Sequence, residues 1–129
     1  MIPWIQIYSN LPRHPKVSAL ADELKLNCAA VNPNAVAVGM LVNLWTWAIQ
    51  NAYDGDLSKC SARAIADACT WRRKPEELLK ALISAGFIDE DMRLHDWEEY
   101  TLLFLDKAEE ERSKTAERVK RYRERQRNA

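Results

Sequence analysis

The stretch that most constrains the fold is AVAVGMLVNLWTWAIQNAY, residues 35–53. Apolar residues occupy nearly every face of a helix drawn through it, so the rest of the chain must cover most of its surface. Its length would just span a bilayer, but Asn43, Gln50 and Asn51 and the lack of a flanking charge bias favour a central core helix. Only three glycines in 129 residues argue against an all-β fold rich in tight turns.

Three shorter helices are predicted around this central one. Each begins at a residue that suits a helix N-terminus, namely Pro15, Ser61 or Pro75. Apolar residues then recur at helical spacing, which places the helices at about 15–26, 61–69 and 75–85. Gly86 stands where the residue after a helix C-terminus is expected.

The remaining segments of the body are predicted to be extended. Residues 3–8 and 56–58 read as short extended pieces, and residues 87–89 and 93–97 read as a β-hairpin turning at 90–92. The order of long helix, short strand, helix, turn, helix and hairpin is the order of a winged helix-turn-helix. We therefore expect a mostly α fold with a small β-hairpin wing, an additional N-terminal helix and a long C-terminal helix.

No helix breaker follows Trp97, so the C-terminal region is predicted to be one long helix. Its first part has side chains that can dock on the core: Tyr100, Leu102, Leu103, Phe104 and Leu105. Beyond Ala108 the apolar residues become sparse, so this half cannot bury much surface by itself. We divide the chain into a winged-helix domain with an N-terminal extension, 1–98, and a C-terminal helix ending in a basic tail, 99–129.

The net charge of zero conceals an uneven distribution along the chain. Residues 112–129 hold eight bases and two acids, a net charge of +6, and the other residues hold eleven bases and seventeen acids, a net charge of −6. The eight bases are Arg112, Lys114, Arg118, Lys120, Arg121, Arg123, Arg125 and Arg127. An acidic body with a basic tail suggests a charged partner such as nucleic acid.

Several motifs resemble one protein family. WIQIYSNLPRHPKVSALADEL at 4–24, LISAGFIDED at 82–91, LHDWEEY at 94–100 and RYRERQRN at 121–128 are similar to phage replication proteins of the replisome-organiser and DnaD-like type. The resemblance spans most of residues 4–127, through short motifs rather than an unbroken match. It implies a winged-helix domain that binds DNA, self-associates or does both. It also implies a role in recruiting replication proteins, such as a helicase or helicase loader, to a phage or prophage origin.

The candidate DNA contacts fall in two places. Before the second helix of the helix-turn-helix pair stand Arg72, Arg73 and Lys74, and Lys80 lies on that helix; the other candidates are Arg118, Lys120, Arg121, Arg123, Arg125 and Arg127 in the tail. Glu76 and Glu77 on the same helix and the acidic wing tip disfavour sequence-specific readout. Alternatively, Trp71 packs and the three bases beside it form a solvated turn, and the tail is a linker or pairs with an acidic surface.

Catalysis has little support in the sequence. The chain has no glycine-rich phosphate loop and no GxSxG motif, and its three cysteines, Cys28, Cys60 and Cys69, are irregularly spaced without a CxxC pair. We therefore expect that the protein is not an enzyme and has no cofactor and no metal site.

The N-terminus lacks a secretory signal pattern, so we expect a cytoplasmic protein that does not enter a membrane. Two functions stay open: a DNA-binding protein of phage replication, and a protein-interaction or oligomerisation module of the replisome.

Overall fold

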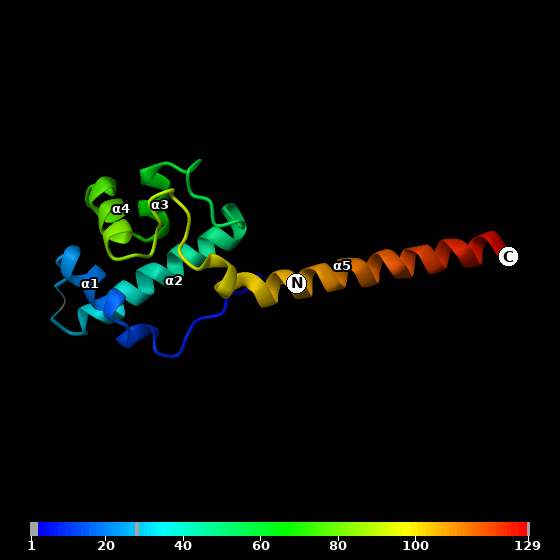
Figure 1. Ribbon diagram of the computed structural model, residues 1–129, viewed down its shortest axis with the longest axis horizontal. Helices are drawn as coiled ribbons and strands as arrows, with labels where there is room; N and C mark the ends of the chain where they lie inside the picture. The colour runs from blue at the N-terminus through cyan, green and yellow to red at the C-terminus, as the bar shows by residue number, and fades with distance from the viewer. Residues whose placement is uncertain (1–2, 28, 129) are drawn as a thin grey trace.

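The helices dominate the computed structural model, which describes residues 3–27 and 29–128, and the side chains in these ranges except those of 102–106, 108 and 128. The elements in chain order are the 3-10 helix η1 (Leu11–Arg13), α1 (Pro15–Glu23), α2 (Pro33–Asn51), α3 (Ala62–Ala68), α4 (Pro75–Ser84) and α5 (Trp97–Asn128) (Figure 1). The predicted mostly α class is confirmed. Each predicted helix is present, and α5 runs unbroken across the predicted domain division at 98/99, a division that stays a prediction.

Side-chain caps set the starts of α2 and α3. The Ser61 hydroxyl accepts a hydrogen bond from the Ala64 N–H at 3.1 Å, as expected of an N-cap serine. The Asn32 side chain accepts one from the Asn34 N–H at 2.9 Å. The central helix α2 consequently begins at Pro33 rather than at residue 35, because Asn32 and Pro33 form its cap and first turn instead of breaking it.

Three of the helices end in the same way, at a residue with positive φ. These residues are Lys25 (φ 52°), Thr70 (φ 62°) and Gly86 (φ 88°). In each case the next N–H bonds back to the last helical turn, from Leu26 to Ala21 O at 3.1 Å, Trp71 to Ala66 O at 2.9 Å and Phe87 to Leu82 O at 2.9 Å. The predicted end of α1 at 26 is therefore wrong: the left-handed Lys25 closes the helix after Glu23.

The core is built around α2, as its sequence predicts. Leu41, Leu44 and Ala48 on this helix are completely buried, and Trp45 is nearly so. Helices α1 and α3 pack against α2, and α4 packs against both α1 and α3. Apolar residues of α1 and α4 complete the core: Val17, Leu20, Leu78 and Leu82.

The predicted β-hairpin wing is not shown. The described residues contain no strand, only two isolated antiparallel bridges, Ile88 with Leu94 and Asp56 with Arg93. The physical reason is the shortness of the extended runs: Met92 (φ 68°) and Asp96 (φ 55°) bend the backbone on either side of the second run. The strand considered at 56–58 is likewise reduced to the bridge at Asp56.

The start of α5 is anchored to the body and to the N-terminal segment. The Tyr100 ring stacks on Trp45, with 4.7 Å between centroids. The Gln6 N–H donates to the Tyr100 carbonyl at 2.7 Å, although residues 3–8 form no regular secondary structure. Thr101 is buried. The predicted docking of Leu102, Leu103, Phe104 and Leu105 lies outside the described side chains.

No helix in the described ranges is both long and apolar enough to cross a bilayer.

Candidate nucleic-acid interface

The turn between α3 and α4 is held rigidly by Trp71. Its indole Nε1 donates to the Lys74 carbonyl at 3.0 Å, and the ring is buried. The residue before it, Thr70, is held at positive φ, where a β-branched side chain is uncommon. The structure therefore agrees with the alternative prediction that Trp71 packs in the turn.

The predicted bases of this turn do not share one environment. The Arg73 guanidinium lies 4.7 Å from the Trp71 ring centre, and its Nη2 donates a long hydrogen bond of 3.4 Å to the Leu24 carbonyl at the end of α1. Arg73 thus interacts with the body itself, through the aromatic face and the negative end of a helix dipole. Arg72, Arg73 and Lys74 are all exposed, so the contacts of Arg73 with the body do not remove it from the surface.

The outward face of α4 carries mixed charge. Lys80, Glu76 and Glu77 are all exposed, and the helix end is tied to α1 by a 2.6 Å hydrogen bond from Ser84 to Glu23. Glu77 and Lys80 line the same surface hollow, next to Glu23 and Lys25. Because acids flank the single base of α4, this helix has little attraction for a phosphate backbone.

The basic tail has a different setting. Helix α5 is 32 residues long, or about 48 Å at the usual helical rise, and its C-terminal half extends away from the body (Figure 1). We call residues 112–127 the basic half. All of its side chains are exposed, the predicted contacts Arg118, Lys120, Arg121, Arg123, Arg125 and Arg127 included.

The charges of the basic half are ordered into stripes. Four bases follow at spacings of four, three and four residues, which places them on one face: Lys114, Arg118, Arg121 and Arg125. Three acids recur every seven residues on a neighbouring line, Glu110, Glu117 and Glu124. An ion pair links Arg121 to Glu117 at 2.9 Å, and both side chains are more than 60% exposed, so it contributes little to stability.

The structure does not bring the two groups of predicted bases together. Helices α3 and α4 lie in the body, whereas the basic half of α5 lies beyond it (Figure 1). The assignment of all ten residues to DNA contact stays a prediction; all ten are exposed, and six of them lie in the basic half.

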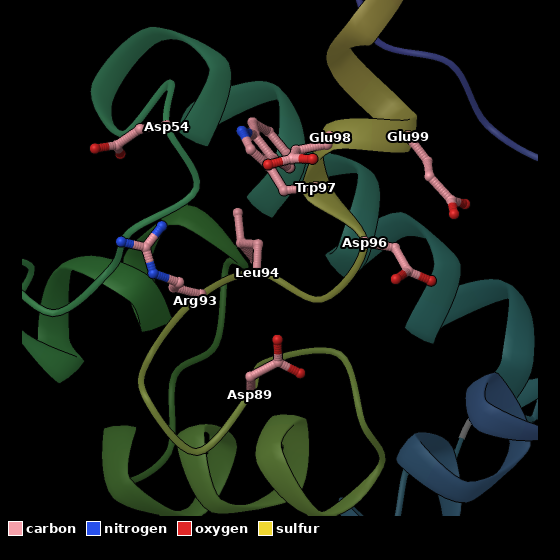
Figure 2. A pocket seen from close by; sticks show the side chains of 8 residues that line it. All are labelled: Asp54, Asp89, Arg93, Leu94, Asp96, Trp97, Glu98 and Glu99. Atoms are coloured by element: carbon pink, nitrogen blue, oxygen red, sulfur yellow. The ribbon is translucent and has the colours of Figure 1, made fainter.

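Sequence reasoning missed an acidic surface at the base of α5. Five carboxylates from three segments of the chain line one hollow beside Arg93, Leu94 and Trp97, and we call them the acidic base: Asp54, Asp89, Asp96, Glu98 and Glu99 (Figure 2). All five are exposed. The sequence signal for this surface was the high proportion of acids in 54–56, 89–91 and 96–99. Acids are also common in turns and at helix starts, so the signal did not distinguish a surface site from ordinary local structure.

One further carboxylate, Asp56, is held by its neighbours at this end of the body. Hydrogen bonds from Ser58 to Asp56, with a smaller effect of the Arg93 guanidinium, lower the pKa of the Asp56 carboxyl. The Arg93 Nη2 lies 3.9 Å from one Asp56 oxygen, and its Nε lies 3.9 Å from Asp91. Arg93 lines the hollow while it pairs with Asp56 and Asp91. The His95 ring contacts two acids of the acidic base, with Nδ1 2.8 Å from Asp89 and Nε2 3.4 Å from Asp96.

Two findings concern the metal-ligating and nucleophilic side chains of the described residues. Among them, no three His, Cys, Asp or Glu residues are grouped to hold a metal ion. Burial raises the pKa of the Cys69 thiol to about 12, so at neutral pH it is a protonated, poorly nucleophilic packing residue. Cys28, the first of the three cysteines, lies outside the described residues.

Comparison with known proteins gives no match to this chain, whether to a protein-family model, to a curated protein or to a solved structure.

Proposed function

We propose that this protein binds DNA through the basic half of α5, with a winged-helix-like body, in phage or prophage DNA replication. The observation that carries the proposal is the exposure of eight bases on a helix that stands clear of an acidic body. Bases placed this way can lie along a phosphate backbone and release its counterions.

The isolation of the basic half matters because opposite charges within the chain would otherwise cancel. From Glu99 to the middle of the basic half at Val119 the helix rises about 30 Å. That is several times the screening length of about 8 Å at physiological salt. The acids of the body therefore do not neutralise the tail, and its positive field is available to a partner.

The mode of binding we propose is largely independent of base sequence. The exposed acids Glu76 and Glu77 on α4 and Asp89 and Glu90 in the turn after it face away from the core, where a DNA-reading helix and wing carry donors. Arg72 and Lys74 supply at most additional phosphate contacts.

The winged-helix description and the replication role rest on two supports. The first is the resemblance of the motifs at 4–24, 82–91 and 94–100 to replisome-organiser and DnaD-like proteins. The second is the pair of antiparallel bridges, Asp56 with Arg93 and Ile88 with Leu94, which join three segments in the order that the strands of a winged helix follow. A helicase or helicase loader is the protein partner that this role implies.

A second function, a protein-interaction or oligomerisation module, is favoured by a separate observation. Val119 and Tyr122 are 42% and 63% exposed on α5, and the acidic base offers a negative surface on the body. Such features suit a protein partner as well as they suit DNA.

The test is a fluorescence-anisotropy titration of labelled duplex and single-stranded DNA from about 50 to 200 mM salt. Replacing Arg118, Arg121 and Arg125 by Gln removes three bases of one stripe, so we expect weaker binding and a log–log salt slope shallower by about 2.7. The matched control replaces Glu110, Glu117 and Glu124 by Gln, which removes three acids from the same helix and is expected to tighten binding.

Two results would reject the proposal. One is a wild-type protein that ignores both DNAs at about 50 mM salt. The other is an arginine variant with unchanged affinity and slope, while circular dichroism shows that its helix content equals that of the control.

A further inference from the structure

The bases of the basic half stand in two stripes on opposite sides of α5. Spacings of four, three and four residues define the first stripe: Lys114, Arg118, Arg121 and Arg125. Spacings of three and four define the second stripe, whose members also line one shallow hollow together: Lys120, Arg123 and Arg127. Successive residues of a helix are rotated by about 100°, so the middle of one stripe lies about 160° around the helix from the middle of the other.

The two sides of α5 between these stripes differ in charge. One side carries the line of acids, to which Glu117 and Glu124 of the basic half belong. The other side, about 170° around the helix from those acids, carries exposed uncharged side chains, which we call the uncharged face: Thr115, Val119, Tyr122 and Gln126. Within 112–127 no acid lies on that face, and Glu111, which lies toward the same side, precedes the basic half.

Two stripes of bases beside one acid-free face match a groove of duplex DNA, which has a phosphate backbone along each edge. We propose that the basic half of α5 lies in the major groove with its uncharged face toward the base edges, an inference that rests on the proposed function. The major groove, about 12 Å wide, admits an α-helix, whereas the minor groove is only about 6 Å wide. Each stripe then meets one backbone, and Glu117 and Glu124 point out of the groove.

Other nucleic acids match this pattern less well. A single strand has one backbone, so it engages one stripe and leaves the other on the far side of the helix. An RNA duplex has two backbones, but its major groove is deep and narrow and does not admit side chains to the bases. The charge pattern of α5 therefore favours duplex DNA over both.

The length of the basic half also suits this placement. Its sixteen residues, 112–127, extend for about 24 Å, which is less than one turn of duplex DNA at about 34 Å. The stripes supply phosphate contacts, which carry little sequence information. On the uncharged face, the Gln126 amide suits an adenine edge and the Val119 methyl groups suit a thymine methyl. Base sequence therefore contributes little beside the phosphate contacts.

The experiment uses the full chain and two exchange variants that keep its composition and net charge. The face variant combines Glu124→Gln with Gln126→Glu, which moves an acid from the outward side of α5 onto the uncharged face. The control variant combines Ser113→Glu with Glu117→Ser, which moves an acid between two positions on the outward side. Attraction by net charge alone predicts the same affinity for wild type and both variants.

Binding is measured by fluorescence anisotropy at about 50 mM salt with a DNA duplex, one of its single strands and an RNA duplex of the same sequence. Wild type and the control variant are expected to bind the DNA duplex about tenfold more tightly than either other probe. The face variant is expected to bind the DNA duplex about tenfold more weakly than wild type, because its new carboxylate faces the phosphates. Circular dichroism of the DNA complexes checks that helix content is equal.

A second probe tests the groove with wild type alone. A duplex whose cytosines carry a bulky sugar group on C5 has a filled major groove, because C5 substituents of pyrimidines lie there. Wild type is expected to bind it about tenfold more weakly than the plain duplex. Equal affinity for the plain and the filled duplex, equal affinity for the DNA and RNA duplexes, or a face variant that binds like the control would each overturn the groove placement while the proposed function stands. A wild type that binds none of the DNA probes would reject both.

Discussion

At the scale of single residues, the junction between α2 and α5 depends on Gly55. Its backbone has φ +79°, and a Cβ built on it would lie 2.6 Å from Cδ1 of Trp97. Trp97 is itself fixed, since its indole donates to the Tyr53 carbonyl at 2.7 Å and its ring is buried. The absence of a side chain at Gly55 therefore allows the first residue of α5 to dock on the body.

Replacing Gly55 by Ala is expected to lower the free energy of unfolding by about 2–4 kcal/mol, from the left-handed backbone and the clash with Trp97 together. The matched control is Gly39→Ala in α2, where a Cβ meets nothing within 4 Å. This change is expected to stabilise the protein by about 0.5–1 kcal/mol, since alanine is the better helix former. Urea denaturation followed by tryptophan fluorescence measures both, and equal effects of the two substitutions would contradict the role given to Gly55.

At the scale of elements, the helices could be predicted from the sequence, whereas the pairing of the extended segments could be predicted only in part. A helix is specified by neighbours in sequence, so Pro15, Ser61 and Pro75 marked starts close to the observed ones. The segment around Leu94 pairs with nearby Ile88, as the predicted hairpin requires, but its amide bonds to the Gly55 carbonyl, which is distant in the sequence. Local alternation suggested a strand there, but the positive φ of Met92 and Asp96 leaves no length for one.

The candidate site divides in the same way. The exposure of the basic half followed from the sequence, because a helix with so few apolar residues has nothing to bury. The acidic base did not follow, because Asp54, Asp89 and Asp96 come from separate turns that meet only in the folded chain. The environment of Arg73 also depends on folding. One partner, Trp71, stands two residues earlier in the turn, but the other, Leu24, lies at the end of α1.

The basic half of α5 is expected to be the least stable helix in the protein. Its side chains are exposed, so it lacks the tertiary packing that normally stabilises a helix. Native-state hydrogen exchange should give opening free energies below about 1 kcal/mol for amides of 114–125. Amides near Leu41 and Leu44 in α2 should open only with global unfolding. Strong protection of 114–125 in dilute protein at high salt would contradict this.

At the scale of the whole molecule, the chain consists of a helical body and a projecting rod (Figure 1). The body is organised around α2 and contains the large buried side chains, among them Trp45 and Leu44. The basic half of the rod carries eight of the nineteen bases and only two acids, and it extends the reach of the molecule without adding to its core. This division separates stability from electrostatic attraction, so changes in the basic half should alter binding and leave the body folded.

The rod should be measurable in solution by small-angle X-ray scattering. A compact protein of this length has a radius of gyration of about 14 Å. A helix about 48 Å long, attached at one end, should raise the value for the monomer to the order of 20 Å. The measurement belongs at high salt, where the acidic base does not attract the basic half. The control is the chain ending at Glu111, which lacks the basic half and should approach the compact value. If the full chain also scatters as a compact particle, α5 bends back onto the body, and then the basic half would not be free to meet DNA as a straight helix.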